Sequence, residues 1–244
     1  MTTDIITLIP ARMKATRLPG KPLAEIAGKP MICHVWEKAV KADLGPVFVA
    51  TDSPKIVAAV EGIGGQAVLT AADHPSGSDR IYEALCHIDA KGKYKAVINL
   101  QADLPELDPV LLEKLAGLLR DPEWDLTTLA APATEDEAAK SQIVKAVVSF
   151  TEQHRRVGRA LYFSRAAIPD GPEGFLHHIG LYGWRREALS QFISLPPSPL
   201  ELSEKLEQLR ALEAGMKIGI AVVDHAPGGI DTENDLAEVR RRLK

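Results

Sequence analysis

Short apolar runs alternate with amphipathic, helix-length segments along most of this chain. The runs typical of buried strands cover residues 5–9, 47–51, 66–69, 96–100, 125–131 and 218–223. The segments with helical periodicity cover residues 30–42, 54–61, 81–89, 109–119, 199–215 and 233–243. Such alternation is typical of βαβ units, so it predicts an α/β fold: a mainly parallel, twisted sheet with helices on both faces.

One part of the chain departs from this pattern. Three strand-like stretches, 144–150, 159–164 and 179–184, follow one another, and no strong helical pattern separates the first two. They predict an antiparallel extension over about residues 144–185 within a single domain of residues 1–244. We expect this extension to serve dimerisation, because paired antiparallel strands often build subunit contacts.

Composition narrows the choice of partners. The chain has 244 residues, a formal net charge of −4 and a pI near 6.0, so its bulk charge gives no sign of nucleic-acid binding. No apolar run approaches the roughly 20 residues of a membrane helix, and the first residues lack the basic segment of a signal peptide. We therefore expect a cytoplasmic protein. Cys33 and Cys86 fall in helical segments and are expected to be buried free thiols.

A loop rich in cations follows the first strand. It reads Pro10-Ala11-Arg12-Met13-Lys14-Ala15-Thr16-Arg17-Leu18-Pro19-Gly20-Lys21-Pro22-Leu23. Open α/β sheets bind ligands at such strand-to-helix connections, and these cations suit a polyphosphate. The loop lacks the glycine spacing of a P-loop and of a dinucleotide fold, and a solvated basic loop is the alternative.

Polar segments at 76–80, 101–105 and 228–232 also follow predicted strands, whose carboxyl ends share one edge of a parallel sheet. Asp103 and Asp231 would supply two carboxylates beside a polyphosphate, which is the protein ligand set that Mg²⁺ commonly uses. Asp231 could instead cap the following helix. Segment 76–80, with two serines and an arginine, suits a nucleobase or ribose, or forms only a polar turn.

The second half of the chain offers further candidates. Arg165 ends a strand and could bind a substrate carboxylate, or form a surface ion pair. His178 and Tyr182 share one face of a strand, although lone histidines are often structural. Glu207 and Gln208 lie in the predicted helix 199–215, where a solvated face is the alternative. No His/Cys spacing suits zinc, and no G-x-S-x-G motif indicates a serine hydrolase.

Taken together, these segments resemble the motifs of the 3-deoxy-manno-octulosonate cytidylyltransferases, or CMP-Kdo synthetases. The matching segments are Ile9–Leu23, Val49–Asp52, Ser76–Arg80, Leu161–Arg165 with Ile168-Pro169, His178–Gly183, Pro199–Glu201, Leu206–Arg210 and Ile230–Thr232. The chain departs from the usual Q-G-D-E-P motif of this family at Ala102 and Leu104.

The resemblance implies a Rossmann-like nucleotide-diphospho-sugar transferase fold and a homodimer. It also implies an Mg²⁺-dependent enzyme that converts CTP and Kdo into CMP-Kdo and pyrophosphate for lipopolysaccharide synthesis. It assigns catalysis to Arg12, Lys21, Asp103 and Asp231, the last two as metal ligands. It assigns nucleotide binding to Pro10, Ala11, Arg12, Lys21, Ser76, Ser78, Arg80 and Gln101, and sugar-acid binding to Gln101, Arg165, His178, Tyr182, Glu207 and Gln208.

Three other functions fit the sequence less well. A transferase for another acidic sugar such as sialic acid fits the motifs from Phe163 to Tyr182 less well. A catalytically silent homologue would not need the cations and carboxylates at the strand ends. A nicotinamide-dependent enzyme would need the missing glycine fingerprint.

Overall fold

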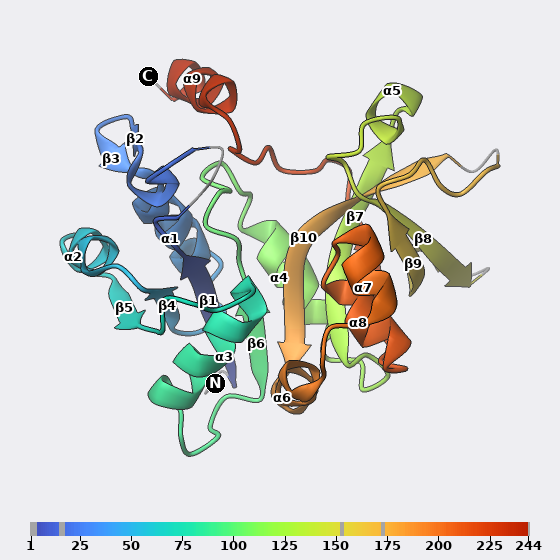
Figure 1. Cartoon of the computed structure of the whole chain (residues 1–244), viewed down its shortest axis with the longest axis horizontal. Coiled ribbons are helices and arrows are strands. Elements are labelled where there is room, and N and C mark those ends of the chain that lie inside the picture. The colour runs from blue at the N-terminus through green and yellow to red at the C-terminus, as the bar shows by residue number, and fades with distance from the viewer. Residues whose placement is uncertain (1–3, 15–17, 152–153, 172–173, 244) are drawn as a thin grey trace. The chain divides into compact units, whose positions relative to one another are not determined.

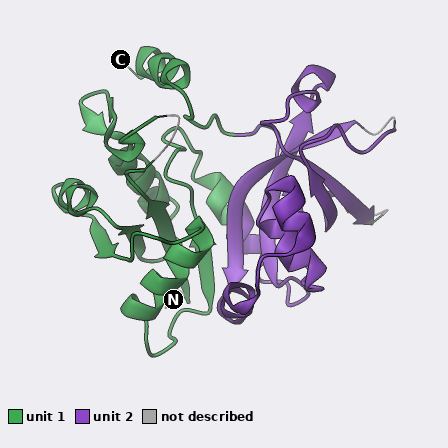
Figure 2. Cartoon of the chain, viewed as in Figure 1, with its two compact units in different colours: residues 1–113, 227–244 green, residues 114–226 purple. Residues whose placement is uncertain are grey.

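The computed structural model describes residues 4–14, 18–151, 154–171 and 174–243. It divides the chain into two compact units (Figure 1, Figure 2). Unit 1 comprises residues 1–113 and 227–244, and unit 2 comprises residues 114–226. The prediction that residues 1–244 form one domain stays a prediction.

Unit 1 is a parallel α/β unit, as the alternating pattern predicts. Its strands run in the order β5 (Gln66–Leu69), β4 (Val47–Thr51), β1 (Ile5–Ala11) and β6 (Ala96–Asn99), and every pairing among them is parallel. Its helices are α1 (Met31–Lys41), α2 (Pro54–Glu61), α3 (Gly77–Ile88) and α9 (Glu233–Arg242). The short helix η1 (Lys21–Leu23) and the two-residue strands β2 (Glu25–Ile26) and β3 (Lys29–Pro30) lie between β1 and α1. The cation-rich loop therefore leaves the carboxyl end of an inner strand.

A small apolar cluster joins the end of the chain to this loop. Its buried members are Leu18, Ile26, Met31, Ile230, Leu236 and Val239. Because the C-terminal helix contributes its two apolar positions to a core that the opening loop also enters, segment 227–232 is held beside that loop. Apolar burial thus places residues at opposite ends of the sequence in one site.

Unit 2 is mixed. Its strands run in the order β10 (Phe175–Arg185), β7 (Leu126–Ala133), β11 (Ile218–Val222), β9 (His154–Ser164) and β8 (Lys145–Thr151). Among the described residues of this unit, the β7–β11 pair alone is parallel, and β8 also pairs with β10 where Lys145 lies opposite His177. The antiparallel character predicted for residues 144–185 is confirmed, whereas its role in dimerisation stays a prediction. The helices are α5 (Glu135–Ala138), α6 (Arg186–Ser194), α7 (Pro199–Glu204) and α8 (Gln208–Glu213), and α4 (Val110–Leu118) spans the point where the chain passes from unit 1 to unit 2.

The prediction of one long helix over residues 199–215 is wrong. Helix α7 ends at Glu204, the next residue, Lys205, adopts the left-handed conformation with φ 57°, and α8 starts at Gln208. The leucine spacing misled the prediction because Leu202 is 65% exposed and does not join a buried stripe. Instead the two short helices are joined by the Arg210 guanidinium, which donates to both oxygens of Glu201 at 2.5 and 2.7 Å.

Two smaller predictions also need correction, and one helix was missed. Helix α3 starts at Gly77, four residues earlier than the pattern predicts, so Arg80 lies in its first turn rather than in a loop. Helix α6 was not predicted at all. Cys33 is buried, but Cys86 is exposed. None of the helices in the described part of the chain combines the length and apolarity that a membrane crossing requires.

Close packing of β11 generates a test of the fold. A methyl group at Gly219 would lie 2.7 to 2.9 Å from ring atoms of Trp124, which is 7% exposed. We expect Gly219→Ala to lower the free energy of unfolding by roughly 1 to 3 kcal/mol, because a packed ring must move. Gly117→Ala is the control, since Gly117 lies in α4 with no atom within 4 Å of the added carbon. Urea unfolding should leave that control unchanged or up to about 1 kcal/mol more stable; equal stability of the two variants would contradict this packing.

Candidate active site

The opening loop folds back on itself before it reaches Lys21. Gly20 has φ 72°, a left-handed conformation that glycine adopts without strain, and its amide donates to the Met13 carbonyl at 3.2 Å. Helix η1 starts at the next residue, so Lys21 follows this turn directly. Lys14 is exposed, as expected of a solvated cation, whereas Thr16 and Arg17 lie outside the described residues.

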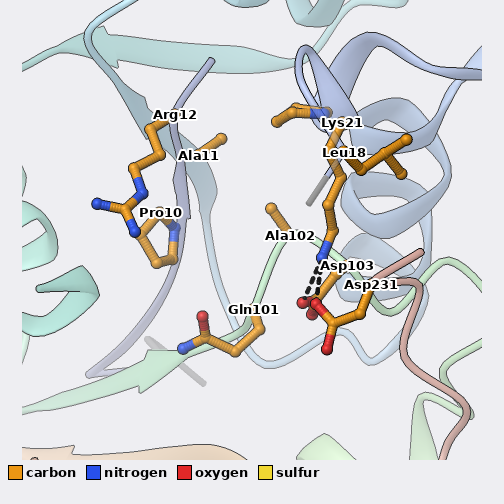
Figure 3. A pocket seen from close by; sticks show the side chains of 10 residues that line it. Pro10, Ala11, Arg12, Leu18, Lys21, Gln101, Ala102, Asp103 and Asp231 are labelled. Carbon is orange, nitrogen blue, oxygen red and sulfur yellow. Dashed lines mark hydrogen bonds and ion pairs between the residues drawn. The ribbon is translucent and has the colours of Figure 1, made fainter. Parts of the chain in front are cut away.

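Lys21 lies between the two carboxylates that the sequence singled out. Its ammonium Nζ is 2.8 Å from Asp103 Oδ2 and 3.1 Å from Asp231 Oδ1 (Figure 3). The lysine side chain is 13% exposed, and those of Asp103 and Asp231 are 32% and 49% exposed. Two carboxylates and a cation from distant parts of the sequence therefore meet at one point.

Backbone contacts determine the position of Asp231. The amide of Ile230 donates to the Asp103 carbonyl at 3.0 Å, which fixes the two acidic segments side by side. The alternative that Asp231 caps α9 is wrong: Thr232 is the N-cap, and Asp235 completes a capping box with it. The Asp231 carboxylate is thus not needed for capping and extends to Lys21.

These two carboxylates fit a magnesium ion that arrives with a polyphosphate. Their oxygens already share one cationic atom, which shows that both can reach a single positive charge. Within the described residues, no group of three or more His, Cys, Asp or Glu side chains gathers as a metal site. Mg²⁺ commonly binds one or two carboxylates and completes its shell with phosphate oxygens and water, so the pair suffices only with a phosphate ligand.

Two hollows lie at this edge and share part of their lining, and the first of them contains the three charged side chains. The first encloses about 270 Å³ and is lined by Pro10, Ala11, Arg12, Leu18, Lys21, Pro22, Gln101, Ala102, Asp103 and Asp231. The second encloses about 140 Å³ and is lined by Pro10, Ala11, Arg12, His74, Ser76, Gly77, Arg80 and Gln101. In Figure 3, Arg12 and Pro10 stand apart from the two carboxylates. The sites predicted at the edge of the parallel strands do converge.

The second hollow has a cationic side. Arg80 is 3% exposed, and its Nη1 donates to Thr70 Oγ1 at 2.6 Å and to the Ala71 carbonyl at 3.0 Å. Burial lowers the pKa of the Arg80 guanidinium, the nearby cation Arg12 lowers it further, and Asp52 opposes this. Arg12 itself is exposed. Two neighbouring guanidinium groups make this hollow suited to an anionic or strongly polar ligand.

The two predicted serines differ in their placement. Ser76 caps α3, since its Oγ accepts from the Asp79 amide at 3.2 Å, and it lines the second hollow. Ser78 is fully buried in the first helical turn and is not among the residues that line either hollow.

Sequence reasoning missed His74, which lines the second hollow. Its Nε2 contacts Glu83 Oε2, and both oxygens of Glu83 accept from the Ala71 amide. Burial raises the pKa of Glu83, but the hydrogen bonds from His74 and Ala71 outweigh it, so the pKa falls below its usual value. The histidine next to the Ser76–Arg80 motif was the available signal.

The two departures from the family motif are accommodated locally. Ala102 is not among the residues with positive φ, so its methyl group adds no backbone strain there, and it lines the first hollow. Leu104 is 8% exposed and packs near Gly229. Leu104 thus makes an apolar contact at the position where the family motif has a glutamate carboxylate.

Two of the residues predicted to bind the sugar acid are buried in unit 2. His178 and Tyr182 are 6% and 5% exposed, and their ring centroids are 5.7 Å apart. The hydroxyl of Thr128 lies 2.9 Å from His178 Nε2 and within 3.0 Å of two carbonyls of β10. Because a hydroxyl has one proton to donate, we assign that proton to a carbonyl and the ring proton to Nε2. Thr128 was missed because a threonine inside a strand carries no distinctive signal.

Helix α8 begins with the two polar residues predicted there. Glu207 is its N-cap and Gln208 its first residue, so neither lies on a solvated helix face. Gln208 is 3% exposed, and its Nε2 finds no hydrogen-bond partner among the described residues. Burial raises the pKa of Tyr182, and the charge of Glu207 raises it further. A buried amide donor without a partner is suited to a ligand oxygen.

Arg165 does not form the surface ion pair that was the alternative. Its guanidinium donates to the carbonyls of Ser141, Glu204 and Lys205 at 3.1, 3.1 and 3.5 Å. Among the residues that the structure describes, these carbonyls are its only acceptors, so no carboxylate side chain neutralises its charge directly.

The parallel unit and its pocket define an α/β protein of the nucleotide-binding class, with cations and paired carboxylates at the strand ends. A family model described as "Cytidylyltransferase" matches residues 6–218. The 3-deoxy-manno-octulosonate cytidylyltransferase of Parvibaculum lavamentivorans is 54% identical over 239 residues, covering 98% of this chain and 92% of its own. The protein of the same name from Bradyrhizobium sp. (strain ORS 278) is 55% identical over 242 residues, covering 99% and 98%.

A solved structure of CMP:2-keto-3-deoxy-manno-octonic acid synthetase complexed with CTP is also similar. It is 39% identical, has a TM-score of 0.89 and covers 98% of each chain. The chain therefore belongs to the cytidylyltransferase family and, within it, to the 3-deoxy-manno-octulosonate cytidylyltransferases.

The burial of His178 generates a pH-dependent prediction. Burial, with a smaller contribution from His177, lowers the pKa of His178 to about 3 in the folded protein, against 6.5 for an exposed histidine. Between these values the unfolded chain binds a proton that the folded chain does not, so stability falls as the pH falls. From pH 7 to pH 5 this one group should cost about 2 kcal/mol of unfolding free energy.

Urea unfolding of the wild type and of His178→Asn at pH 7, 6 and 5 measures this effect. The wild type should lose more stability than the variant over that range, because the variant lacks the titrating ring. Parallel losses in the two proteins would show that His178 titrates normally in the folded state.

Proposed function

We propose that this protein is a cytidylyltransferase that transfers CMP from CTP to 3-deoxy-D-manno-octulosonate, giving CMP-Kdo and pyrophosphate. The observation that carries the proposal is the Lys21–Asp103–Asp231 cluster at the carboxyl edge of a parallel sheet, in a chain whose relatives bear this enzyme name. Lipopolysaccharide synthesis, a cytoplasmic location and a homodimeric assembly belong to the same proposal.

We assign CTP to the two hollows of unit 1. Arg12 and Lys21 are the proposed triphosphate ligands, since both line the first hollow. The proposed contacts to the nucleoside come from Pro10, Ala11, Ser76, Ser78, Arg80 and Gln101. All of these except Ser78 line the second hollow, which supports a cytidine there.

Asp103 and Asp231 would hold Mg²⁺. When bound, the ion would offset phosphate charge and make the attacking hydroxyl more acidic. Lys21 would then exchange its two carboxylate partners for phosphate oxygens, because its long side chain can turn to a nearby anion while its backbone stays in η1.

We assign the sugar acid to unit 2. The contact of Gln101 with the sugar acid, which the resemblance implies, stays a prediction. Arg165 is the proposed partner of the substrate carboxylate, and its guanidinium carries a charge that no carboxylate side chain of the described residues pairs with directly. His178, Tyr182, Glu207 and Gln208 would bind hydroxyl groups of the sugar. The neutral imidazole and the buried amide of Gln208 support this role, since both are hydrogen-bonding groups without charge.

The reaction needs positioning and charge compensation more than a reactive side chain. The anomeric hydroxyl of the sugar acid attacks the α-phosphorus and releases its proton to solvent. The bond between the α-phosphorus and the oxygen that bridges to the β-phosphorus breaks, and pyrophosphate leaves with that oxygen. Arg12 and Lys21 would hold the phosphates in line and stabilise the negative charge that develops on the leaving group. No residue of the set needs to act as a covalent nucleophile.

Pyrophosphate release tests the substrates. Purified protein is incubated with Mg²⁺, CTP and Kdo, with sialic acid and UTP as parallel substitutes for Kdo and CTP. The proposal expects release with CTP and Kdo and little with either substitute. Turnover with sialic acid but not with Kdo would assign the protein to another acidic sugar, and no turnover at all would indicate a catalytically silent homologue.

A single substitution tests the metal assignment. Asp103→Asn should lower kcat by about two orders of magnitude or more, since it removes one of two carboxylates from the proposed metal site. Folding should persist, because Asp103 is partly exposed. Asp43→Asn is the matched control: Asp43 is an exposed residue of the same unit with φ 49°, a conformation that asparagine tolerates. Near-normal turnover of Asp103→Asn, measured beside that control, would remove Asp103 from the metal site.

A further inference from the structure

Glu204 lies at the centre of a hydrogen-bond network around Arg165. Its Oε1 and Oε2 accept from Ser164 Oγ at 2.9 and 3.0 Å, and Oε2 also accepts from the Arg165 amide at 3.2 Å. The hydroxyl of Tyr162 is 3.4 Å from Oε1. One carboxylate thus binds three polar groups at the end of β9.

The backbone of Glu204 holds the Arg165 side chain as well. Its carbonyl accepts from Arg165 Nε at 3.1 Å, and the next carbonyl, that of Lys205, accepts from Nη2 at 3.5 Å. The carboxylate therefore holds the main chain of Arg165, while the carbonyls of Glu204 and Lys205, together with that of Ser141, hold its guanidinium. The negative charge stays away from the guanidinium nitrogens, which leaves the cation available to an incoming anion.

Glu204 also links this network to helices α7 and α8. It is the last residue of α7, and the left-handed Lys205 that follows ends the helix. Glu207, three residues after Glu204, is the N-cap of α8, and Gln208 is its first residue. Glu204 consequently joins the end of β9 to the turn that presents both polar residues of α8.

Lys145 also binds the main chain of Arg165, at its carbonyl group. It is fully buried, and its ammonium donates to the carbonyls of Arg165, Ile143 and Lys140 at 2.6, 2.9 and 3.3 Å. Burial lowers the pKa of Lys145, the cation Arg165 lowers it further, and the charge of Glu204 opposes both. The carboxylate thereby offsets part of the repulsion between two neighbouring cations.

We propose that Glu204 is a positioning residue for sugar-acid binding, which orients the Arg165 guanidinium and the start of α8 together. This inference rests on the proposed function, because it takes the substrate of this site to be an anionic sugar. Glu204 need not touch the substrate. Its removal should therefore weaken binding of the sugar acid and leave binding of CTP unchanged.

The test compares Glu204→Gln with Glu187→Gln, an exposed glutamate of the same unit. Glu204→Gln keeps the volume of the side chain, but it removes the negative charge and replaces one acceptor oxygen with a donor, which must face either the Arg165 amide or the Tyr162 hydroxyl. We expect the KM for Kdo to rise about tenfold, as for a lost hydrogen bond to a charged group. The KM for CTP should stay within about twofold of the wild type, and both KM values should stay within that limit in Glu187→Gln.

Two further measurements separate positioning from general stability. Ser164→Ala removes the main hydroxyl partner, and its effect on the KM for Kdo should be smaller in the Glu204→Gln background than alone. The Arg165 Nε–H resonance, assigned with Arg165→Lys, should be protected from hydrogen exchange in the wild type and lose that protection in Glu204→Gln.

The outcomes are distinct. An unchanged KM for Kdo in Glu204→Gln overturns the proposal. A parallel rise in the KM for both substrates with a lower melting temperature also overturns it, because Glu204 would then only stabilise the fold. If the wild type does not turn over Kdo, the proposed function itself fails, and the exchange of the Arg165 proton still shows whether Glu204 orders that guanidinium.

Discussion

The site in unit 1 depends on two carboxylates lying close together. Asp103 and Asp231 would repel each other without a cation between them, and Lys21, 82 and 210 residues away in sequence, supplies it. The fold serves this contact: the apolar cluster of Leu18, Ile26, Met31, Ile230, Leu236 and Val239 fixes the end of the chain beside the opening loop. Because both carboxylates are partly exposed, the proposed exchange of this cation for a metal ion would leave the core undisturbed.

In unit 2, unlike unit 1, most of the polar groups of the proposed site are buried. They are either uncharged or bound to backbone carbonyls. His178 stays neutral because burial lowers its pKa, and Tyr182 stays protonated because burial raises its own pKa. Charged groups there are arranged around backbone carbonyls, as Lys145 and Arg165 show. Such a region suits recognition of a hydroxylated anion, since it offers neutral donors and acceptors together with one guanidinium that no carboxylate side chain of the described residues pairs with directly.

The parallel unit could be predicted from the sequence because each strand and helix carries its own periodic signal. The predicted convergence of Arg12, Lys21, Gln101, Asp103 and Asp231 followed from the rule that parallel strand ends share an edge. The break at Lys205 could not be predicted, since it depends on the tertiary pair Glu201–Arg210 and leaves Leu202 exposed. His74, Thr128 and Glu204 were missed because their roles depend on partners distant in sequence or on contacts that no local pattern encodes.

The most direct test of the account is where the cations lie when CTP is bound. We would crystallise the protein with CTP and Mn²⁺, which substitutes for Mg²⁺ and can be located by anomalous scattering. We expect a manganese peak bound by both Asp103 and Asp231, with Lys21 Nζ moved onto a phosphate oxygen of CTP. A complex in which Lys21 still bridges the two carboxylates, and the metal lies elsewhere, would contradict this expectation.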